Sequence, residues 1–243
     1  MKGTRVLMTA LAIASGNASS QSHDYDTFYG EQPGAVFSAP IGHRHDPIKP
    51  DAHVIFSYPG REGYFSELRT TLGEKPLKIQ IWQDRILVNR KSFRLSHAIA
   101  FPQEQATYIF PDSSEVFVAA STDSHPPLLC VSGHGSASGE ASSRYQQIFL
   151  LIDPLASKPT FLQLPGLLSS CRAVVSTNHG KLAYPKSSYI YEDTKGYRVG
   201  LLLSYYSFDG RRFAPVDKAV RLRFAEPENP FQFSLFNDSG ESQ

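Results

Sequence analysis

From residue 53 onward, short runs of β-branched, aromatic and other apolar residues alternate with clusters of turn-forming residues. Such runs between turn residues are typical of β-strands, and only one short stretch has helical spacing. The pattern predicts an all-β fold built from antiparallel sheets. The predicted strands are His53–Tyr58, Leu77–Trp82, Arg85–Val88, Tyr108–Phe110, Glu115–Ala119, Leu128–Ser132, Gln146–Ile152, Thr160–Leu164, Ala173–Ser176, Lys181–Tyr184, Ser188–Tyr191, Arg198–Phe208, Arg212–Pro215, Val220–Phe224 and Phe231–Phe236.

The one helix-like stretch is Tyr64–Leu68, which is predicted to form one or two turns ended by Gly73. Among the turns, Asp209-Gly210 is a strong hairpin signal, because glycine adopts a positive φ without the steric cost of a Cβ atom. Helical structure is therefore expected to be minor.

A strand–turn–strand pattern recurs loosely along the chain. It begins at Ile148 and again about 53 residues later at Leu201, with a shorter version at Ile79. Hairpins at this spacing are typical of propeller-like blades, but a β-sandwich accounts for the same hairpins. Both architectures remain open, within a single domain.

The first 20 residues have the parts of a secretory signal peptide. Lys2 and Arg5 supply positive charge, Val6–Ala14 is an apolar run of nine residues, and small or polar residues follow. Nine helical residues cover only about 14 Å, which is too short to span a bilayer. We expect a signal peptide over residues 1–20, an irregular leader over 21–52, an all-β domain over 53–236 and a frayed tail over 237–243. The mature protein is then periplasmic or secreted, with no membrane anchor.

Cys130 and Cys171 are the only cysteines of the chain. In an exported protein an even pair most simply forms one disulfide, and two unpaired buried cysteines in neighbouring strands are the alternative. The bridge would close a loop of about 42 residues and stabilise the fold by about 4 kcal/mol on the chain-entropy estimate.

The charges of the chain nearly balance. The 24 Lys and Arg residues face 23 Asp and Glu residues, and removal of Lys2 and Arg5 changes the net charge from +1 to −1. Nucleic-acid binding relies on a basic surface, so we expect no nucleic-acid partner. The hydrophobic share of 41% also excludes disorder for the bulk of the chain.

No motif of the sequence carries a catalytic or cofactor-binding pattern. His43 and His45 form the best metal-like pair, but prolines surround them, and we interpret them as loop histidines in solvent. The Gly- and Ser-rich segment 132–143 lacks the spacing of a nucleophile elbow or a phosphate loop and is interpreted as a flexible loop. The acidic residues form no evident catalytic pair. We expect no cofactor and a non-enzymatic role.

Tyrosines of the C-terminal half are the remaining candidates for binding, because Tyr and Arg are favoured anchors at protein interfaces. Alternate residues of a strand face opposite sides, so consecutive tyrosines are not both expected to enter the core. The alternative is that these tyrosines cap sheet edges with their hydroxyls in water. The candidate binding residues are Tyr189, Tyr191, Tyr197, Tyr205, Tyr206, Arg211 and Arg212.

The segment Leu203-Ser-Tyr-Tyr-Ser-Phe-Asp-Gly-Arg-Arg-Phe-Ala-Pro-Val, 14 residues of 243, resembles the terminal hairpin of many small exported bacterial β-proteins. Some of those are propeller-like periplasmic inhibitors or immunity proteins that neutralise cell-wall hydrolases or other toxic effectors. The resemblance implies an exported protein that binds such an effector or hydrolase. The alternative is a secreted hydrolase or carbohydrate-binding module with an aromatic-lined cleft.

Overall fold

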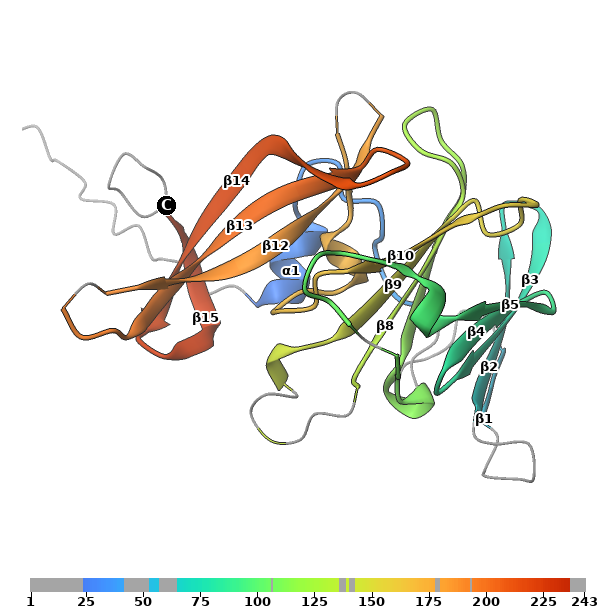
Figure 1. Ribbon diagram of the computed structural model, residues 1–243, viewed down its shortest axis with the longest axis horizontal. Helices are drawn as coiled ribbons and strands as arrows, with labels where there is room; N and C mark the ends of the chain where they lie inside the picture. Colours follow the sequence, from blue (N-terminus) through green and yellow to red (C-terminus); the bar gives the residue numbers. More distant parts are fainter. Residues whose placement is uncertain are drawn as a thin grey trace, which may run out of the picture.

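Three five-stranded β-sheets make up most of the computed structural model of the chain (Figure 1). The structure describes residues 24–41, 53–56, 65–105, 107–135, 139, 143–177, 180–192 and 194–236. Over these residues the fold is largely antiparallel β with almost no helix, and one sheet curls into a half-barrel. The all-β prediction is therefore confirmed. No propeller is found in the described part of the chain.

The first sheet has the strand order β1-β2-β3-β4-β5, the middle sheet β6-β10-β9-β8-β7 and the third sheet β11-β12-β13-β14-β15. All the strand pairs are antiparallel except β6 with β10. The strands are β1 His53–Phe56, β2 Phe65–Leu72, β3 Lys75–Trp82, β4 Arg85–Val88, β5 Lys91–Arg94, β6 Ile99–Ala100, β7 Glu115–Ala119, β8 Leu128–Gly133, β9 Gln147–Ile152, β10 Thr160–Leu164, β11 Val175–Ser176, β12 Leu182–Tyr191, β13 Arg198–Phe208, β14 Phe213–Glu226 and β15 Asn229–Phe236. The short helices of the described residues are α1 Tyr25–Gly30, which precedes the first strand, and η1 Leu95–His97, η2 Pro111–Ser113 and η3 Cys171–Ala173, which lie between strands.

Apolar clusters fill the spaces between these layers. Leu68 and Ile79 of the first sheet share one cluster with Phe149 of the middle sheet. The opposite face of the middle sheet meets the third sheet, where Ile148 and Tyr184 belong to a second cluster. The far face of the third sheet packs against α1 in a third cluster. The middle sheet is thus covered on both faces, and the layers follow one another along the long axis (Figure 1).

This layering explains why the middle strands have uninterrupted apolar sequences. All six residues of β8 are buried, and four of the six in β9 are buried as well. A strand with only one buried face alternates apolar and polar residues, whereas a strand covered on both faces does not. The run Leu128–Val131 is therefore the sequence signature of the central layer.

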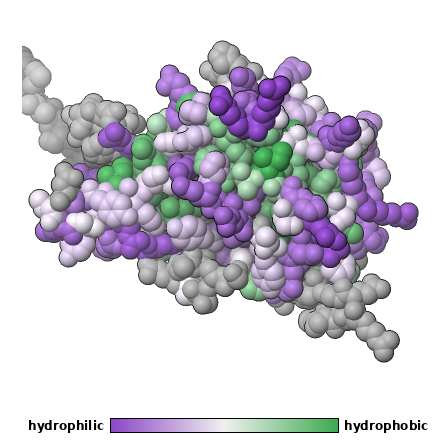
Figure 2. Space-filling model, in the orientation of Figure 1, coloured by the Kyte–Doolittle hydropathy of each residue, from purple (hydrophilic) through white to green (hydrophobic). Residues whose placement is uncertain are grey.

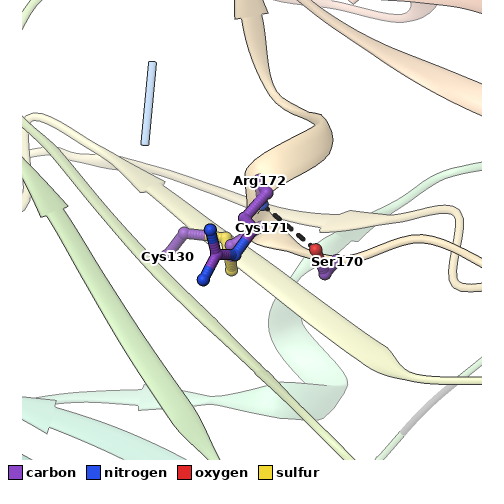
Figure 3. Close-up of a disulfide and its surroundings, with 4 residues drawn as sticks. All are labelled: Cys130, Ser170, Cys171 and Arg172. Carbon is purple, nitrogen blue, oxygen red and sulfur yellow. Dashed lines mark hydrogen bonds between the residues drawn. A yellow bond between two sulfur atoms is a disulfide. The ribbon is translucent and has the colours of Figure 1, made fainter. Parts of the chain in front are cut away.

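The predicted disulfide joins Cys130 of β8 to Cys171 of η3, with Cα atoms 5.9 Å apart (Figure 3). Both cysteines are fully buried in the cluster between the middle and third sheets. The bond ties the central layer to the short helix that leads into β11. The prediction of one bridge is confirmed.

The predicted strands agree with the structure best where a short apolar run is bounded by turn residues. Arg85–Val88, Glu115–Ala119, Thr160–Leu164 and Arg198–Phe208 are strands with the predicted bounds. The prediction of a helix over Tyr64–Leu68 was wrong, because most of this stretch belongs to strand β2. There Leu68 pairs with Ile79 and Thr70 with Leu77 of β3, and this partner strand outweighs the local helical spacing.

Several other elements differ from the prediction. The predicted runs 181–184 and 188–191 belong, except for Lys181, to one strand, β12. The predicted runs 212–215 and 220–224 belong, except for Arg212, to β14. Tyr108–Phe110 is not a strand, and α1 and β5 were not predicted. The recurring hairpins β3–β4, β9–β10 and β13–β14 lie in three different sheets. These sheets pack face to face as successive layers and not around a common axis, so the loose repeat does not form the blades of a propeller.

The predicted signal peptide and frayed tail, as well as His43 and His45, lie outside the described residues. The part of the leader that the structure describes, residues 24–41, contains α1 and an isolated bridge between Ala35 and Val175. Among the described residues no helix is long and apolar enough to cross a membrane.

The first sheet carries one buried carboxylate, Glu67 of β2. Its oxygens accept hydrogen bonds from Arg69 Nε at 3.0 Å and Gln80 Nε2 at 2.8 Å, and Lys78 Nζ lies 3.0 Å away. Burial acts to raise the pKa of Glu67, but the hydrogen bonds from Gln80, Lys78 and Arg69 outweigh burial and lower it. The charged form is therefore the one that stabilises the sheet.

We predict that the stability contributed by Glu67 is present above its unfolded-state pKa of about 4.3 and is lost as the pH falls through its lower folded-state pKa. Glu67→Gln should lower the free energy of unfolding at neutral pH and flatten its decline between about pH 5 and pH 3. Urea unfolding across this range measures both effects. Glu74→Gln, at an exposed position on the turn between β2 and β3, is the matched control. Identical pH profiles for Glu67→Gln and the wild type would contradict this assignment.

Candidate functional site

The predicted binding residues divide between the two ends of the third sheet. Tyr189, Tyr191 and Tyr197 lie at the β12–β13 hairpin, whereas Tyr206, Arg211 and Arg212 lie at or near the β13–β14 hairpin. β13 separates these ends, and its eleven residues extend over roughly 33 Å at 3.3 Å per residue. The predicted residues therefore do not form one continuous face.

Tyr205 and Tyr206 both pack against apolar clusters, on opposite faces of the sheet. Tyr205 is fully buried in the cluster beneath α1, with Lys218 Nζ 4.4 Å above its ring. Tyr206 is half-buried and meets the ring of Phe101 edge-on at 5.0 Å. Only Tyr205 enters the core, whereas Tyr206 stays partly exposed at the edge of the cluster on the other face, as expected for consecutive residues of a strand. Tyr205 is a core residue and is removed from the candidate surface.

At the β13–β14 hairpin the polar residues build the turn. Asp209 Oδ1 accepts hydrogen bonds from the backbone N–H groups of Arg211 and Arg212, both at 2.9 Å. These backbone hydrogen bonds lower the pKa of Asp209. Figure 2 shows apolar residues near the place where this hairpin approaches β10, with hydrophilic residues around them. Arg211 and Arg212 themselves are exposed at the tip.

At the other end of the sheet lies a group of residues that we call the tyrosine patch. It consists of Tyr189, Tyr191 and Arg198 of the third sheet and Tyr145 from the segment before β9. Tyr191 is 57% exposed and Tyr145 46% exposed. The rings of Tyr189 and Tyr191 meet edge-on at 6.4 Å, and the Arg198 guanidinium lies 5.0 Å from the Tyr189 ring. Burial raises the pKa of Tyr145, and the nearby charge of Tyr189 adds to the increase.

An ion pair and two hydrogen bonds hold the patch in place. Glu228 Oε2 accepts hydrogen bonds from Arg198 Nε and Nη2, both at 2.6 Å. Buried Arg144 donates through Nη1 to the Tyr189 hydroxyl and through Nη2 to the Glu228 carbonyl, each at 3.4 Å. Tyr189 also packs against Phe224 in the cluster beneath α1. The patch is therefore anchored before any partner arrives.

Tyr197 lies on the same hairpin, where its carbonyl accepts a hydrogen bond from the Glu192 N–H at 2.8 Å. Its side chain is 48% exposed. The structure thus brings Tyr189 and Tyr191 together and places Tyr197 beside them on the turn.

A polar pocket of about 380 Å³, the Arg144 pocket, adjoins the patch through Arg144. It is formed by the start of α1, the residues before β9, the loop before η3 and the start of β15. Its lining residues are Asp24, Tyr25, Asp26, Ser143, Arg144, Gln146, Leu168, Ser169, Ser170 and Phe231. The pocket therefore combines both signs of charge, hydroxyl groups and two aromatic rings.

The disulfide and its neighbours support one wall of this pocket (Figure 3). Ser170 and Arg172 flank Cys171, and the Ser170 hydroxyl accepts a hydrogen bond from the Arg172 N–H at 3.3 Å. Arg172 Nε lies 3.7 Å from Asp26 Oδ1, and Arg172 Nη1 donates to the Ser38 carbonyl at 2.7 Å. The covalent bond thus places the loop that faces α1.

Asp24 has a second role at the opposite wall as the N-cap of α1. Its Oδ1 accepts a hydrogen bond from the Thr27 N–H at 2.7 Å. This backbone hydrogen bond, together with one from the Thr27 side chain, lowers the pKa of Asp24 and keeps the carboxylate charged at neutral pH.

Sequence reasoning missed Tyr145, Arg144 and the two aspartates of the pocket. Arg144 and Tyr145 directly follow the Gly- and Ser-rich segment, and an adjacent arginine and tyrosine after such a segment is the signal that could have drawn attention to them. Asp24 precedes Tyr25-Asp26-Thr27, which is a helix N-cap pattern in the leader. Their meeting depends on long-range packing. Among the described residues no three His, Cys, Asp or Glu side chains are grouped to hold a metal ion.

We predict opposite effects for two buried tyrosines of the same cluster. The Tyr205 hydroxyl has no hydrogen-bond partner among the described residues, whereas the Tyr29 hydroxyl donates to the Leu168 carbonyl at 3.0 Å. Tyr205→Phe should raise the free energy of unfolding by about 1 kcal/mol, and Tyr29→Phe should lower it by about 1 kcal/mol. Denaturant unfolding of both variants checks the signs, and the reverse order would contradict the assignment.

No protein-family model, curated protein sequence or solved structure matches this chain. Any inference about its function therefore rests on its own residues and their arrangement.

Proposed function

We propose that this chain is an exported, non-enzymatic all-β protein of layered, sandwich-like architecture that binds another protein through the tyrosine patch. Its partner would be a toxic effector or a cell-wall hydrolase, which it would inhibit or neutralise in the periplasm. The observation that carries the proposal is the exposed pair Tyr145 and Tyr191 beside the anchored Tyr189 and Arg198.

Two features support export. The chain begins with a segment that has the pattern of a signal peptide. In addition, Cys130 and Cys171 form a buried disulfide, and structural disulfides persist chiefly in oxidising compartments such as the periplasm.

The chemistry of the patch suits a protein partner. Tyrosine offers a large contact area with only two side-chain torsions to immobilise, and tyrosine and arginine dominate binding energy at many interfaces. The Arg198–Glu228 ion pair and the Arg144 hydrogen bonds hold the patch in place, so less side-chain entropy is lost on binding. Balanced overall charge favours recognition by such local contacts over long-range electrostatic attraction.

We predict that Tyr145→Ser combined with Tyr191→Ser weakens partner binding. Mature wild-type protein, immobilised and exposed to the soluble envelope fraction of its own cells, should enrich one protein whose activity it then inhibits in purified form. The double variant should bind that purified protein at least tenfold more weakly, since anchor residues contribute at least about 1.4 kcal/mol.

Ile99→Ser is the matched control, because Ile99 is 43% exposed on the middle sheet and lies outside the patch. It should bind like the wild type. Equal binding by the double variant and the wild type would show that the patch is not the interface, and failure to enrich any inhibited protein would contradict the proposed function.

The second candidate function is a secreted hydrolase or carbohydrate-binding module, and the Arg144 pocket favours it. The pocket joins the carboxylates of Asp24 and Asp26 to the aromatic rings of Tyr25 and Phe231. Screens for glycan binding and for glycoside or ester hydrolysis distinguish the two functions. Turnover that disappears in Asp26→Asn would favour the enzyme over the binding protein.

A further inference from the structure

The Arg144 pocket contains a buried positive charge on one side and negative charges on the other. Arg144 is only 7% exposed, and its side chain carries the positive charge of a guanidinium. Asp24 is the N-cap of α1 and Asp26 lies in its first turn, and both residues are exposed and line the pocket. The positive charge of Arg144 is therefore buried, whereas the negative charges of Asp24 and Asp26 are exposed to solvent.

The groups that hold these charges are fixed by the fold. Arg144 is held by the Tyr189 hydroxyl and the Glu228 carbonyl. Asp24 is held by the Thr27 N–H, and Asp26 faces Arg172 beside the disulfide. A site whose charged groups are positioned beforehand loses little entropy when a ligand binds.

The remaining walls offer hydroxyl groups and apolar surface. Ser169 and Ser170 are buried and line the pocket with the Gln146 amide, while Leu168, Tyr25 and Phe231 provide apolar contacts. A volume of about 380 Å³ lies at the small end of ligand pockets, which span about 300 to 1,000 Å³. The space suits a molecule of the size of an amino acid or a very short peptide.

The mixed charges narrow the class of ligand. A simple anion would meet the carboxylates of Asp24 and Asp26, and a simple cation would meet Arg144, so each alone faces a like charge. A ligand with both charges satisfies both sides, because its carboxylate pairs with a guanidinium and its ammonium with the aspartates. We propose that the Arg144 pocket binds a small zwitterion, an α-amino acid or a short peptide, with its carboxylate toward Arg144 and its ammonium toward Asp24 and Asp26.

This site is separate from the tyrosine patch in its chemistry, and its existence does not depend on a protein partner. The apolar contacts of Tyr25 and Phe231 favour a ligand with an aromatic or aliphatic side chain. Arg144 connects the two sites, since this residue lines the pocket and its guanidinium donates a hydrogen bond to Tyr189.

The test is calorimetric titration of the mature, oxidised protein with phenylalanine and with the dipeptide alanylphenylalanine, which distinguish a free amino acid from a peptide. Two blocked dipeptides, one N-acetylated and one amidated, each remove one charge of the zwitterion. At least one of the two unblocked ligands should bind saturably. If the dipeptide binds, each blocking group should weaken its binding at least tenfold. If only phenylalanine binds, its N-acetyl and amide derivatives replace the blocked dipeptides.

The matched variant is Asp24→Asn, because asparagine is as good an N-cap as aspartate and removes only the charge. This variant should bind the unblocked ligand at least tenfold more weakly than the wild type does. Its affinity for the N-acetylated ligand should equal that of the wild type. Asp209→Asn makes the same change at a turn-capping aspartate of the β13–β14 hairpin and should leave binding unchanged. This design avoids Arg144 variants, whose buried hydrogen bonds are part of the fold.

Three results would overturn the proposal. The first is no saturable binding of either unblocked ligand. The second is binding that is indifferent to both blocking groups or to Asp24→Asn. The third is binding of N-acetylglucosamine in place of the zwitterions, which would assign the pocket to sugars.

Discussion

The disulfide between Cys130 and Cys171 is the constraint on which the rest of the molecule depends. It joins the centre of the middle sheet to η3, the short helix at the entrance to the third sheet. From that helix, Ser170 reaches the wall of the Arg144 pocket and Arg172 reaches Asp26 of α1. One covalent bond between two layers therefore also sets the distance between the parts that form the pocket.

The layered packing decides which tyrosines are available for binding. The third sheet is covered by α1 on one face and, at the β13–β14 end, by the middle sheet on the other. Tyrosines at that end, such as Tyr184 and Tyr205, are buried in the core and cannot contact a partner. The β12–β13 hairpin extends beyond this cover, so Tyr191 remains exposed. The same aromatic composition thus serves packing at one end of β13 and recognition at the other.

The fold class could be predicted from the sequence because strand propensity and turn chemistry are local. The turn residues around Arg85–Val88 and Thr160–Leu164 mark those strands without any knowledge of their partners. The strand over Phe65–Leu72 was missed because its identity depends on pairing with β3 across the turn at Gly73. The order of the layers also depends on long-range contacts, and only the uninterrupted apolar run of β8 pointed to a central sheet. Of the candidate site, the tyrosine patch could be predicted in part from the sequence, but the Arg144 pocket could not. Tyr189 and Tyr191 are two apart on one strand, whereas Arg144 and Asp24 reach the same pocket from segments 120 positions apart in the sequence.

The most direct test is to compare the unfolding of the oxidised protein with that of the Cys130→Ala/Cys171→Ala variant, by denaturant titration and by hydrogen exchange. The account predicts that the variant loses about 4 kcal/mol of unfolding free energy, because a loop of about 42 residues is no longer closed in the unfolded chain. It also predicts faster exchange in residues 169–173, the segment that the bond holds against the middle sheet. Two titratable thiols in the unfolded, non-reduced wild type, or equal stability and exchange in the two proteins, would contradict it.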